Sequence, residues 1–160
     1  MLRNISRELL EMDIIDKRIL HILHKNARIT ASDISNQINL SVSAVGDRLK
    51  KLEASGMIEN YTTILNSTML GKSLTAIIMV ALERPKYAEV FEVFVNNEKD
   101  ILDCYYLAGD YDYALKIVTK DTATLETLIG KIKNVEGLLK TKTTIVLSTI
   151  KDVHSVLPEL

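Results

Sequence analysis

The chain has 160 residues, 47% of them hydrophobic, and a formal net charge of only −1 at pH 7. This length provides one sizeable hydrophobic core or two small ones, and no apolar run reaches the roughly 20 residues that span a membrane. A membrane partner and a uniformly basic nucleic-acid-binding chain are therefore excluded, and we expect a cytoplasmic protein.

The charges are unevenly distributed along the chain. Residues 12–56 contain seven Lys or Arg against five Asp or Glu, whereas residues 67–160 contain eleven against thirteen. The first part is therefore weakly basic, which has the right sign for contact with phosphate groups. Because each phosphate contact contributes only modestly, high affinity for DNA would require two copies acting together.

The first 56 residues predict a helical DNA-binding domain. Residues 1–11 form a short amphipathic lead, and Asp13 caps a helix that stops near Asn26. The apolar positions of this helix lie on one face, which indicates that it packs on a core. These positions are Met12, Ile15, Ile19, Leu20 and Leu23.

Residues 28–53 predict two further short helices joined by a tight polar turn. Thr30 caps the first, whose inner positions are Ile34 and Ile38, and Ser41 caps the second. The second helix has a buried stripe at Val42, Val45, Leu49 and Leu52 and small residues at its tip. A helix that enters the major groove of DNA has this layout, although a three-helix scaffold for protein contacts would show the same pattern.

The candidate DNA-binding residues lie at the starts of these two helices and along the outer face of the second. Ser41, Ser43, Asp47 and Lys50 are expected to face the groove, with Arg48 and Lys51 holding phosphates at its edge. The full set is Thr30, Ser32, Ser41, Val42, Ser43, Asp47, Arg48, Lys50 and Lys51.

A linking segment follows this domain. Gly56 suits a left-handed helix C-cap, and residues 57–65 are β-branched and roughly alternating, which predicts a strand. Residues 66–72, which include Gly71, are the predicted hinge. The domain boundaries are therefore 1–56 for the helical domain, 57–72 for the link and 73–160 for a second domain.

The second domain alternates strands and helices in the order β-α-β-β-α-β. Strands are predicted at 74–83, 101–108, 113–119 and 138–150, with helices at 85–97 (Val90, Phe94 and Val95 inward) and 121–135. This α+β pattern predicts a ferredoxin-like sandwich, one antiparallel sheet beneath two helices. Because residues 74–83 are apolar on both faces, the face without helices needs a cover, and a second copy of the chain is the simplest one.

The segment between the second and third strands is the candidate site for a small ligand. Its backbone N–H groups and acidic side chains suit an amino-acid zwitterion, although Gly and Asp are also what any tight hairpin requires. Thr141 and Thr143 share one face of the last strand and could bind the same ligand. The candidate residues are Leu107, Ala108, Gly109, Asp110, Tyr111, Asp112, Thr141 and Thr143.

The remaining reactive side chains show no catalytic or metal-binding pattern. Cys104 is the only cysteine and lies in an apolar strand pattern, so we expect an inert, buried thiol and a reducing compartment. His21 and His24 have no third ligand close in sequence, so we expect them to face solvent, with no metal site. We expect no cofactor and no enzymatic activity.

An ordered set of short motifs resembles the Lrp/AsnC family of transcription regulators. The motifs are MDxxDxxIL from Met12, LSxSxV…RLKKLExxGxI over 40–58, GDYDY over 109–113 and TxTxIVL over 141–147. The resemblance implies a winged-type helix-turn-helix joined to a ligand-sensing αβ domain. It also implies homodimers, often four of them in an octamer, and a small effector, commonly an amino acid, bound where dimers meet. The chain departs from the family at Ala44, where proline is usual, and at Asp47, where a basic residue is common.

Two other functions remain open at this point. The sirohaem decarboxylases share the two-domain plan, but no histidine lies between Lys25 and Val153, so tetrapyrrole chemistry lacks its usual acid. An architectural protein that compacts DNA without an effector would have the same helix-turn-helix. An effector-responsive regulator would be stabilised by an added amino acid, whereas an architectural DNA-binding protein would not.

Overall fold

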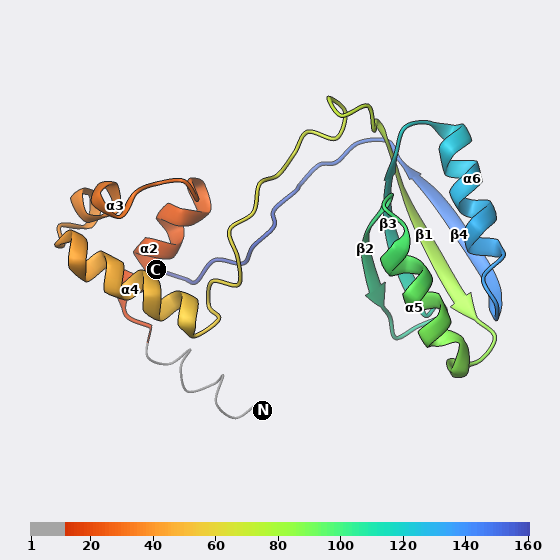
Figure 1. Cartoon of the computed structure of the whole chain (residues 1–160), viewed down its shortest axis with the longest axis horizontal. Coiled ribbons are helices and arrows are strands. Elements are labelled where there is room, and N and C mark those ends of the chain that lie inside the picture. Colours follow the sequence, from red (N-terminus) through yellow and green to blue (C-terminus); the bar gives the residue numbers. More distant parts are fainter. Residues whose placement is uncertain (1–11) are drawn as a thin grey trace. The chain divides into compact units, whose positions relative to one another are not determined.

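The computed structural model describes residues 12–160 (Figure 1), so the predicted amphipathic lead over residues 1–11 lies outside the described residues. These residues form two units. Residues 12–64 group with Asp152–Leu160, and Leu65–Lys151 form the second unit. The sequence-based boundaries place the last nine residues with the second domain instead. Within residues 12–160, no helix is both long and apolar enough to span a membrane.

The first unit contains three helices, each begun by a polar side chain. Helix α2 (Ile14–Lys25) is capped by Asp13, whose carboxylate accepts from the N–H groups of Ile15 and Asp16. Helices α3 (Ala31–Ile38) and α4 (Val42–Ala54) are capped by the hydroxyls of Thr30 and Ser41. These caps satisfy N–H groups that have no partner inside the helix, which fixes where each helix begins.

One small core holds the three helices together. Its buried members are Ile19, Leu23, Ile34, Val45 and Leu52. The predicted buried stripe of α4 is therefore confirmed for Val45 and Leu52. The prediction that Val42 is buried is wrong, because its side chain is 49% exposed. Val42 occupies the first turn of α4, which extends past the edge of the core.

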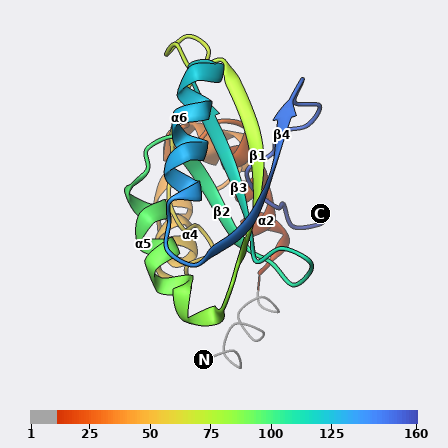
Figure 2. The ribbon, with the colours of Figure 1, turned by 90° about the vertical axis from the view of Figure 1, so that its right-hand side faces the viewer.

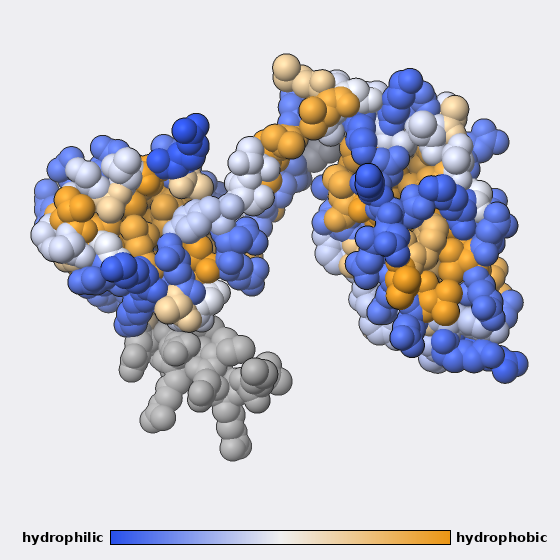
Figure 3. All heavy atoms as spheres, in the orientation of Figure 1, coloured by the Kyte–Doolittle hydropathy of each residue, from blue (hydrophilic) through white to orange (hydrophobic). Residues whose placement is uncertain are grey.

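The link to the second unit contains no strand. Gly56 has a φ of 76°, in agreement with the predicted left-handed cap, but residues 59–66 form neither helix nor strand. The predicted strand over 57–65 is therefore wrong, because a strand needs a neighbour for its backbone groups and none of the described residues supplies one. Apolar side chains stay exposed along this link, including Ile64, Leu65 and Met69 (Figure 3).

The second unit is a four-stranded antiparallel sheet in the order β2-β3-β1-β4, which confirms the ferredoxin-like prediction. Helices α5 (Ala88–Asn97), which follows the short 3₁₀ helix η2 (Pro85–Tyr87), and α6 (Thr122–Lys133) lie on the same face of the sheet (Figure 2). The strands are β1 (Leu74–Leu82), β2 (Ile101–Tyr106), β3 (Tyr113–Thr119) and β4 (Leu138–Val146).

The core of this unit lies between the sheet and the two helices. Alternate residues of β1 and β3 point into it, among them Ile78, Val80 and Leu115. Phe94 and Val95 lie inward on α5, as predicted, but Val90 is wrong, because it is 46% exposed whereas Phe91 is fully buried. Phe91 stacks on Tyr113 with ring centroids 4.8 Å apart, and this contact fixes the rotation of α5.

Neither helix of the second unit, α5 or α6, lies on the other face of the sheet. Ile77 and Met79 of β1 point to this open face and remain half-buried. They pair with Lys116 and Ala114 of β3 across the sheet, and Lys116 forms an ion pair with Asp103 at 3.7 Å. The open face is therefore an apolar stripe bordered by charges.

Candidate functional site

The outer side of α4 presents a row of exposed polar side chains, namely Ser43, Asp47 and Lys50. Successive turns of the helix place them along one line, as the sequence predicted. Neither Asp47 nor Lys50 makes an ion pair with another described residue, so both remain available for a ligand. Lys51 is exposed on the flank of this row. We call Ser43, Asp47 and Lys50 the outer row.

The starts of α3 and α4 contribute further exposed groups. Thr30 and Ser32 are exposed at the beginning of α3, and the Thr30 hydroxyl donates to the Asp33 carboxylate at 2.6 Å. The Ser41 hydroxyl accepts from the Ala44 N–H at 3.2 Å and lies 3.0 Å from that of Ser43. Ser41 therefore serves first as a cap.

Arg48 has a different position from the one that the sequence predicted. Its Nη1 donates to Asp13 Oδ2 and to Asp16 Oδ1, each at 2.7 Å. The guanidinium is thus paired with two carboxylates of α2, a position that the prediction of a phosphate contact at the groove edge did not include. Hydrogen bonds from the helix N-terminus, above all from Asp16, and the Arg48 guanidinium lower the pKa of Asp13, although burial opposes them.

In the second unit, the connection between β2 and β3 lies across the end of β1. The Leu107 N–H donates to the Asp112 carbonyl at 2.7 Å, and the Asp112 N–H donates to the Val80 carbonyl at 2.9 Å. The Asp112 carboxylate accepts from the Leu82 N–H at 2.7 Å. The N–H groups of residues 108–111 find no partner among the described residues, so they are free to bind an anion.

Gly109 is not required by its own backbone. It lacks the positive φ found at Gly56, Gly71 and Gly137, and a Cβ built on it would meet nothing within 4 Å. Gly137, in contrast, has a φ of 78°, and a Cβ there would lie 2.0 Å from the Tyr87 ring. A tight turn therefore does not explain the glycine at 109.

The structure brings Lys140, rather than the two predicted threonines, to this connection. Lys140 Nζ lies 4.6 Å from the centroid of the Tyr111 ring. Thr141 and Thr143 pair with Val80 and Ile78, so they point to the side of the sheet that the helices cover. Thr141 and Thr143 share one face of β4, as predicted. Lys140, which contacts Tyr111, points to the opposite face. The sequence signal for Lys140 was its position directly before Thr141.

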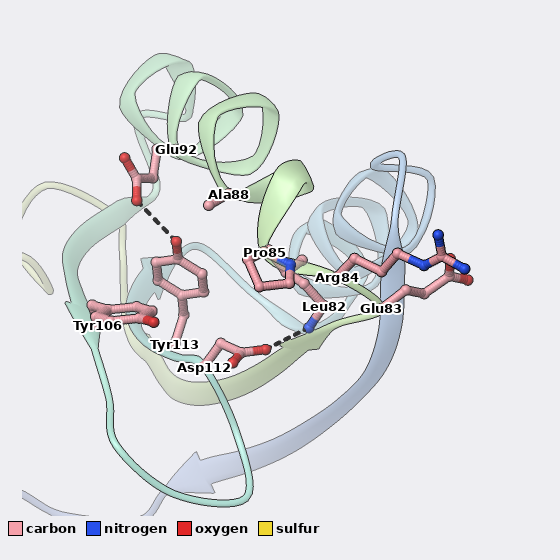
Figure 4. A pocket seen from close by; sticks show the side chains of 9 residues that line it. All are labelled: Leu82, Glu83, Arg84, Pro85, Ala88, Glu92, Tyr106, Asp112 and Tyr113. Atoms are coloured by element: carbon pink, nitrogen blue, oxygen red, sulfur yellow. Dashed lines mark hydrogen bonds between the residues drawn. The ribbon is translucent and has the colours of Figure 1, made fainter.

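A hollow of about 210 Å³ lies beside the same connection (Figure 4). The Tyr113 hydroxyl donates to Glu92 Oε1 at 2.8 Å at one side of it, and Tyr106 lies next to Tyr113. Burial and the contact with Glu92 raise the pKa of Tyr113, so its phenol stays protonated. The sequence does not predict this hollow, because only the fold brings its residues together. They are Leu82, Glu83, Arg84, Pro85, Ala88, Glu92, Tyr106, Asp112 and Tyr113.

Two predictions about reactive side chains need correction. Cys104 is exposed rather than buried, although partial burial and nearby Glu92 raise the pKa of its thiol and so reduce its reactivity. His21 is half-buried and lies 2.9 Å from the Pro158 carbonyl through Nε2, instead of facing solvent. In residues 12–160, no group of three or more His, Cys, Asp or Glu side chains is placed to hold a metal ion.

A helix-turn-helix with a free outer row, joined to a separate αβ unit, defines a DNA-binding protein with a regulatory domain. Family models support this conclusion. Residues 12–59 match the winged helix-turn-helix DNA-binding model, and residues 75–156 match the Lrp/AsnC ligand binding domain. The chain belongs to the Lrp/AsnC family and is a DNA-binding transcriptional regulator with a ligand-binding domain.

Individual relatives agree with this assignment. The chain is 38% identical to the HTH-type transcriptional regulator FL11 of Pyrococcus abyssi, covering 88% of this chain and 93% of that protein. It is 32% identical to the leucine-responsive regulatory protein of Escherichia coli K12, covering 88% of each. A transcriptional regulator of Neisseria meningitidis, solved as a complex with L-Met, has a TM-score of 0.85 and 28% identity over 91% of this chain and 96% of that one.

Proposed function

We propose that this regulator changes its DNA binding in response to a small amino acid bound at the connection over residues 107–112. Gly109 carries the proposal. Neither its backbone nor the described residues around it require a glycine, and its lack of a side chain leaves the backbone open to something outside the chain. A ligand that approaches the backbone closely is such a requirement.

The groups around the connection suit a zwitterion. The free N–H groups of residues 108–111 and the Lys140 ammonium can hold a carboxylate. Asp110 is exposed, and Asp112 uses one carboxylate oxygen on the Leu82 N–H, which leaves acidic oxygens for an ammonium group. The Neisseria relative that was solved with L-Met supports an amino acid as the ligand class.

On the first unit, the outer row is the proposed groove-facing surface. Lys50 and Lys51 can contact phosphates or base edges, and Asp47 can accept a hydrogen bond from a cytosine amino group. Because Asp47 has no ion-pair partner among the described residues, its carboxylate is free for this contact. Asp47 then gives the protein a preference for certain DNA sequences, and it does not contribute to attraction of the DNA phosphates.

We also propose a homodimer formed through the open face of the sheet. Ile77 and Met79 are apolar and uncovered by any helix of their own unit, so burial against the same face of a second copy is favourable. Octamers of four such dimers would place effector sites between dimers. A ligand there acts on DNA binding by favouring one assembly over another, since it cannot reach the groove itself.

The proposal describes a binding protein rather than an enzyme. The polar residues around the hollow are carboxylates, phenols and one arginine, and the sequence has no histidine between 25 and 153. The Tyr113 phenol, which has a raised pKa, is a hydrogen-bond donor and not a base at neutral pH.

Thermal unfolding in the presence of single amino acids tests the proposal. A bound effector must raise the melting temperature, because it binds only the native state. We expect one or a few amino acids to do so for the natural protein and for Gly130→Val, a control at which a Cβ also meets nothing. Gly109→Val should melt normally and lose the shift. If Gly109→Val kept the full shift in melting temperature, the connection would not be the binding site. If no amino acid stabilised the natural protein although it bound DNA, the protein would be an architectural one.

A further inference from the structure

Arg48 connects the helix that carries the outer row to the start of the first helix. Its Nη1 bridges Asp13 Oδ2 and Asp16 Oδ1 at 2.7 Å each. The Asp13 carboxylate does two things at once, because its Oδ1 caps α2 while its Oδ2 binds Arg48. We call Arg48, Asp13 and Asp16 the ionic brace.

The brace is partly removed from water, which makes its geometry specific. Asp16 is only 5% exposed, whereas the Arg48 side chain is 29% exposed. A buried carboxylate requires a charged or hydrogen-bonding partner, so Asp16 strongly favours the position of α4 that brings Arg48 to it. A planar guanidinium can serve two carboxylates in one fixed arrangement, which a flexible lysine ammonium does less well.

The other contacts of α4 with its unit are largely apolar. Val45 and Leu52 pack into the small core, and the ion pairs of Arg48 add directional contacts to this apolar packing. Arg48 directly follows Asp47 and lies two residues before Lys50. Holding Arg48 therefore fixes the direction in which the outer row points.

We infer that Arg48 is a positioning residue for DNA recognition, which orients the outer row through Asp13 and Asp16 instead of binding phosphate. The inference rests on the proposed role of the outer row. It assigns the first turn of α2 a function in sequence discrimination, although that turn does not touch the bases.

Removing an acid from the brace gives a test in which two accounts predict opposite signs. Asp13→Asn keeps a good helix cap but removes one of the two negative charges that hold Arg48. Loss of a negative charge from a DNA-binding domain should strengthen binding if only long-range electrostatics matter. If positioning matters, affinity for the preferred sequence should fall, while affinity for unrelated DNA stays the same or rises.

The measurement is fluorescence anisotropy with a duplex that the natural protein selects from a random pool, and with a scrambled duplex, over a range of salt. For Asp13→Asn and Arg48→Met we expect the ratio of the two affinities to fall on the order of tenfold, the usual effect of one mismatched base pair. The salt dependence of scrambled-duplex binding should stay unchanged, because Arg48 does not neutralise a phosphate in this account. Arg48→Lys should restore part of the ratio. Glu59→Gln, which removes an acid that makes no ion pair in the described chain, should leave the ratio unchanged.

Circular dichroism at the assay temperature shows whether each variant is folded. If Arg48→Met does not fold, Asp13→Asn alone still tests the inference. The inference is overturned if Asp13→Asn keeps the natural ratio, or if Arg48→Met reduces the salt dependence by about one unit, as removal of a phosphate-binding side chain would. Lys50→Ala separates this failure from failure of the proposed surface. If Lys50→Ala also binds both duplexes normally, the outer row is not the DNA-binding surface.

Discussion

The ammonium group of Lys140 lies 4.6 Å from the centroid of the Tyr111 ring, and this contact joins β4 to the connection between β2 and β3. The two residues are far apart in sequence, yet the sheet order places β4 beside β1, whose end the connection crosses. A positive charge thereby lies over the Tyr111 ring, within the connection whose N–H groups at residues 108–111 have no partner among the described residues.

This relationship predicts a role for Lys140 in effector affinity. Lys140→Gln should weaken amino-acid binding roughly two- to fivefold, because an exposed charge contributes up to about 1 kcal/mol. Isothermal titration calorimetry measures the change. Lys133→Gln is the control, since Lys133 is an exposed lysine at the end of α6, away from the open face of the sheet. Equal affinities of the two variants would argue against the proposed carboxylate position.

Lys50 and Lys51 should contact the DNA. Replacing both by alanine should weaken binding and reduce the slope of log affinity against log salt by about one unit for each phosphate that the protein no longer neutralises. Anisotropy titrations at several salt concentrations give the slope. A double variant that bound DNA as the natural protein does at every salt concentration would show that α4 faces away from the groove.

Met79 should lie inside a dimer interface. Met79→Asp buries an unpaired charge there, which costs about 3 kcal/mol and raises the dimer dissociation constant roughly a hundredfold. Light scattering should report a smaller mass for this variant, while Thr127→Asp on the exposed side of α6 should keep the natural mass. A stable Met79→Asp dimer would contradict the sheet-to-sheet arrangement.

The C-terminal segment should stabilise the helix-turn-helix unit. A carbonyl oxygen only accepts hydrogen bonds, so His21 Nε2 donates to Pro158 in the observed contact at 2.9 Å. His21→Ala should lower the free energy of unfolding of this unit by about 1 kcal/mol. Chemical denaturation followed by circular dichroism measures the loss, with exposed His24→Ala as control. Equal effects of both variants on the unfolding free energy would mean that the contact does not contribute.

The sequence predicted most of the elements because their signals are local. The caps at Asp13, Thr30 and Ser41 and the apolar run of β1 depend on neighbours within a few residues. The predictions failed where distant residues decide. The strand over 57–65 has the right composition but no partner strand, and Val90 and Phe91 exchanged places because a Tyr113 ring from another strand selects the buried one.

The candidate sites show the same division. The outer row followed from helical spacing alone, but Arg48 shared that spacing and was drawn away by two carboxylates more than 30 residues earlier. Residues 107–112 could be chosen from their composition. Lys140 and Tyr106 could not, because only the sheet register brings them to this end of the unit. Glu92 could not either, because it reaches the site from α5 through its contact with Tyr113.

The central claim is that an amino acid bound to the second unit changes how the first unit binds DNA. The most direct test is the affinity of the full chain for its selected duplex, measured with and without each common amino acid. We predict that the amino acid that raises the melting temperature also changes the DNA affinity, by roughly 5- to 150-fold, the usual range of coupling between two sites. A protein whose DNA affinity stayed constant while the same amino acid saturated it would contradict the account.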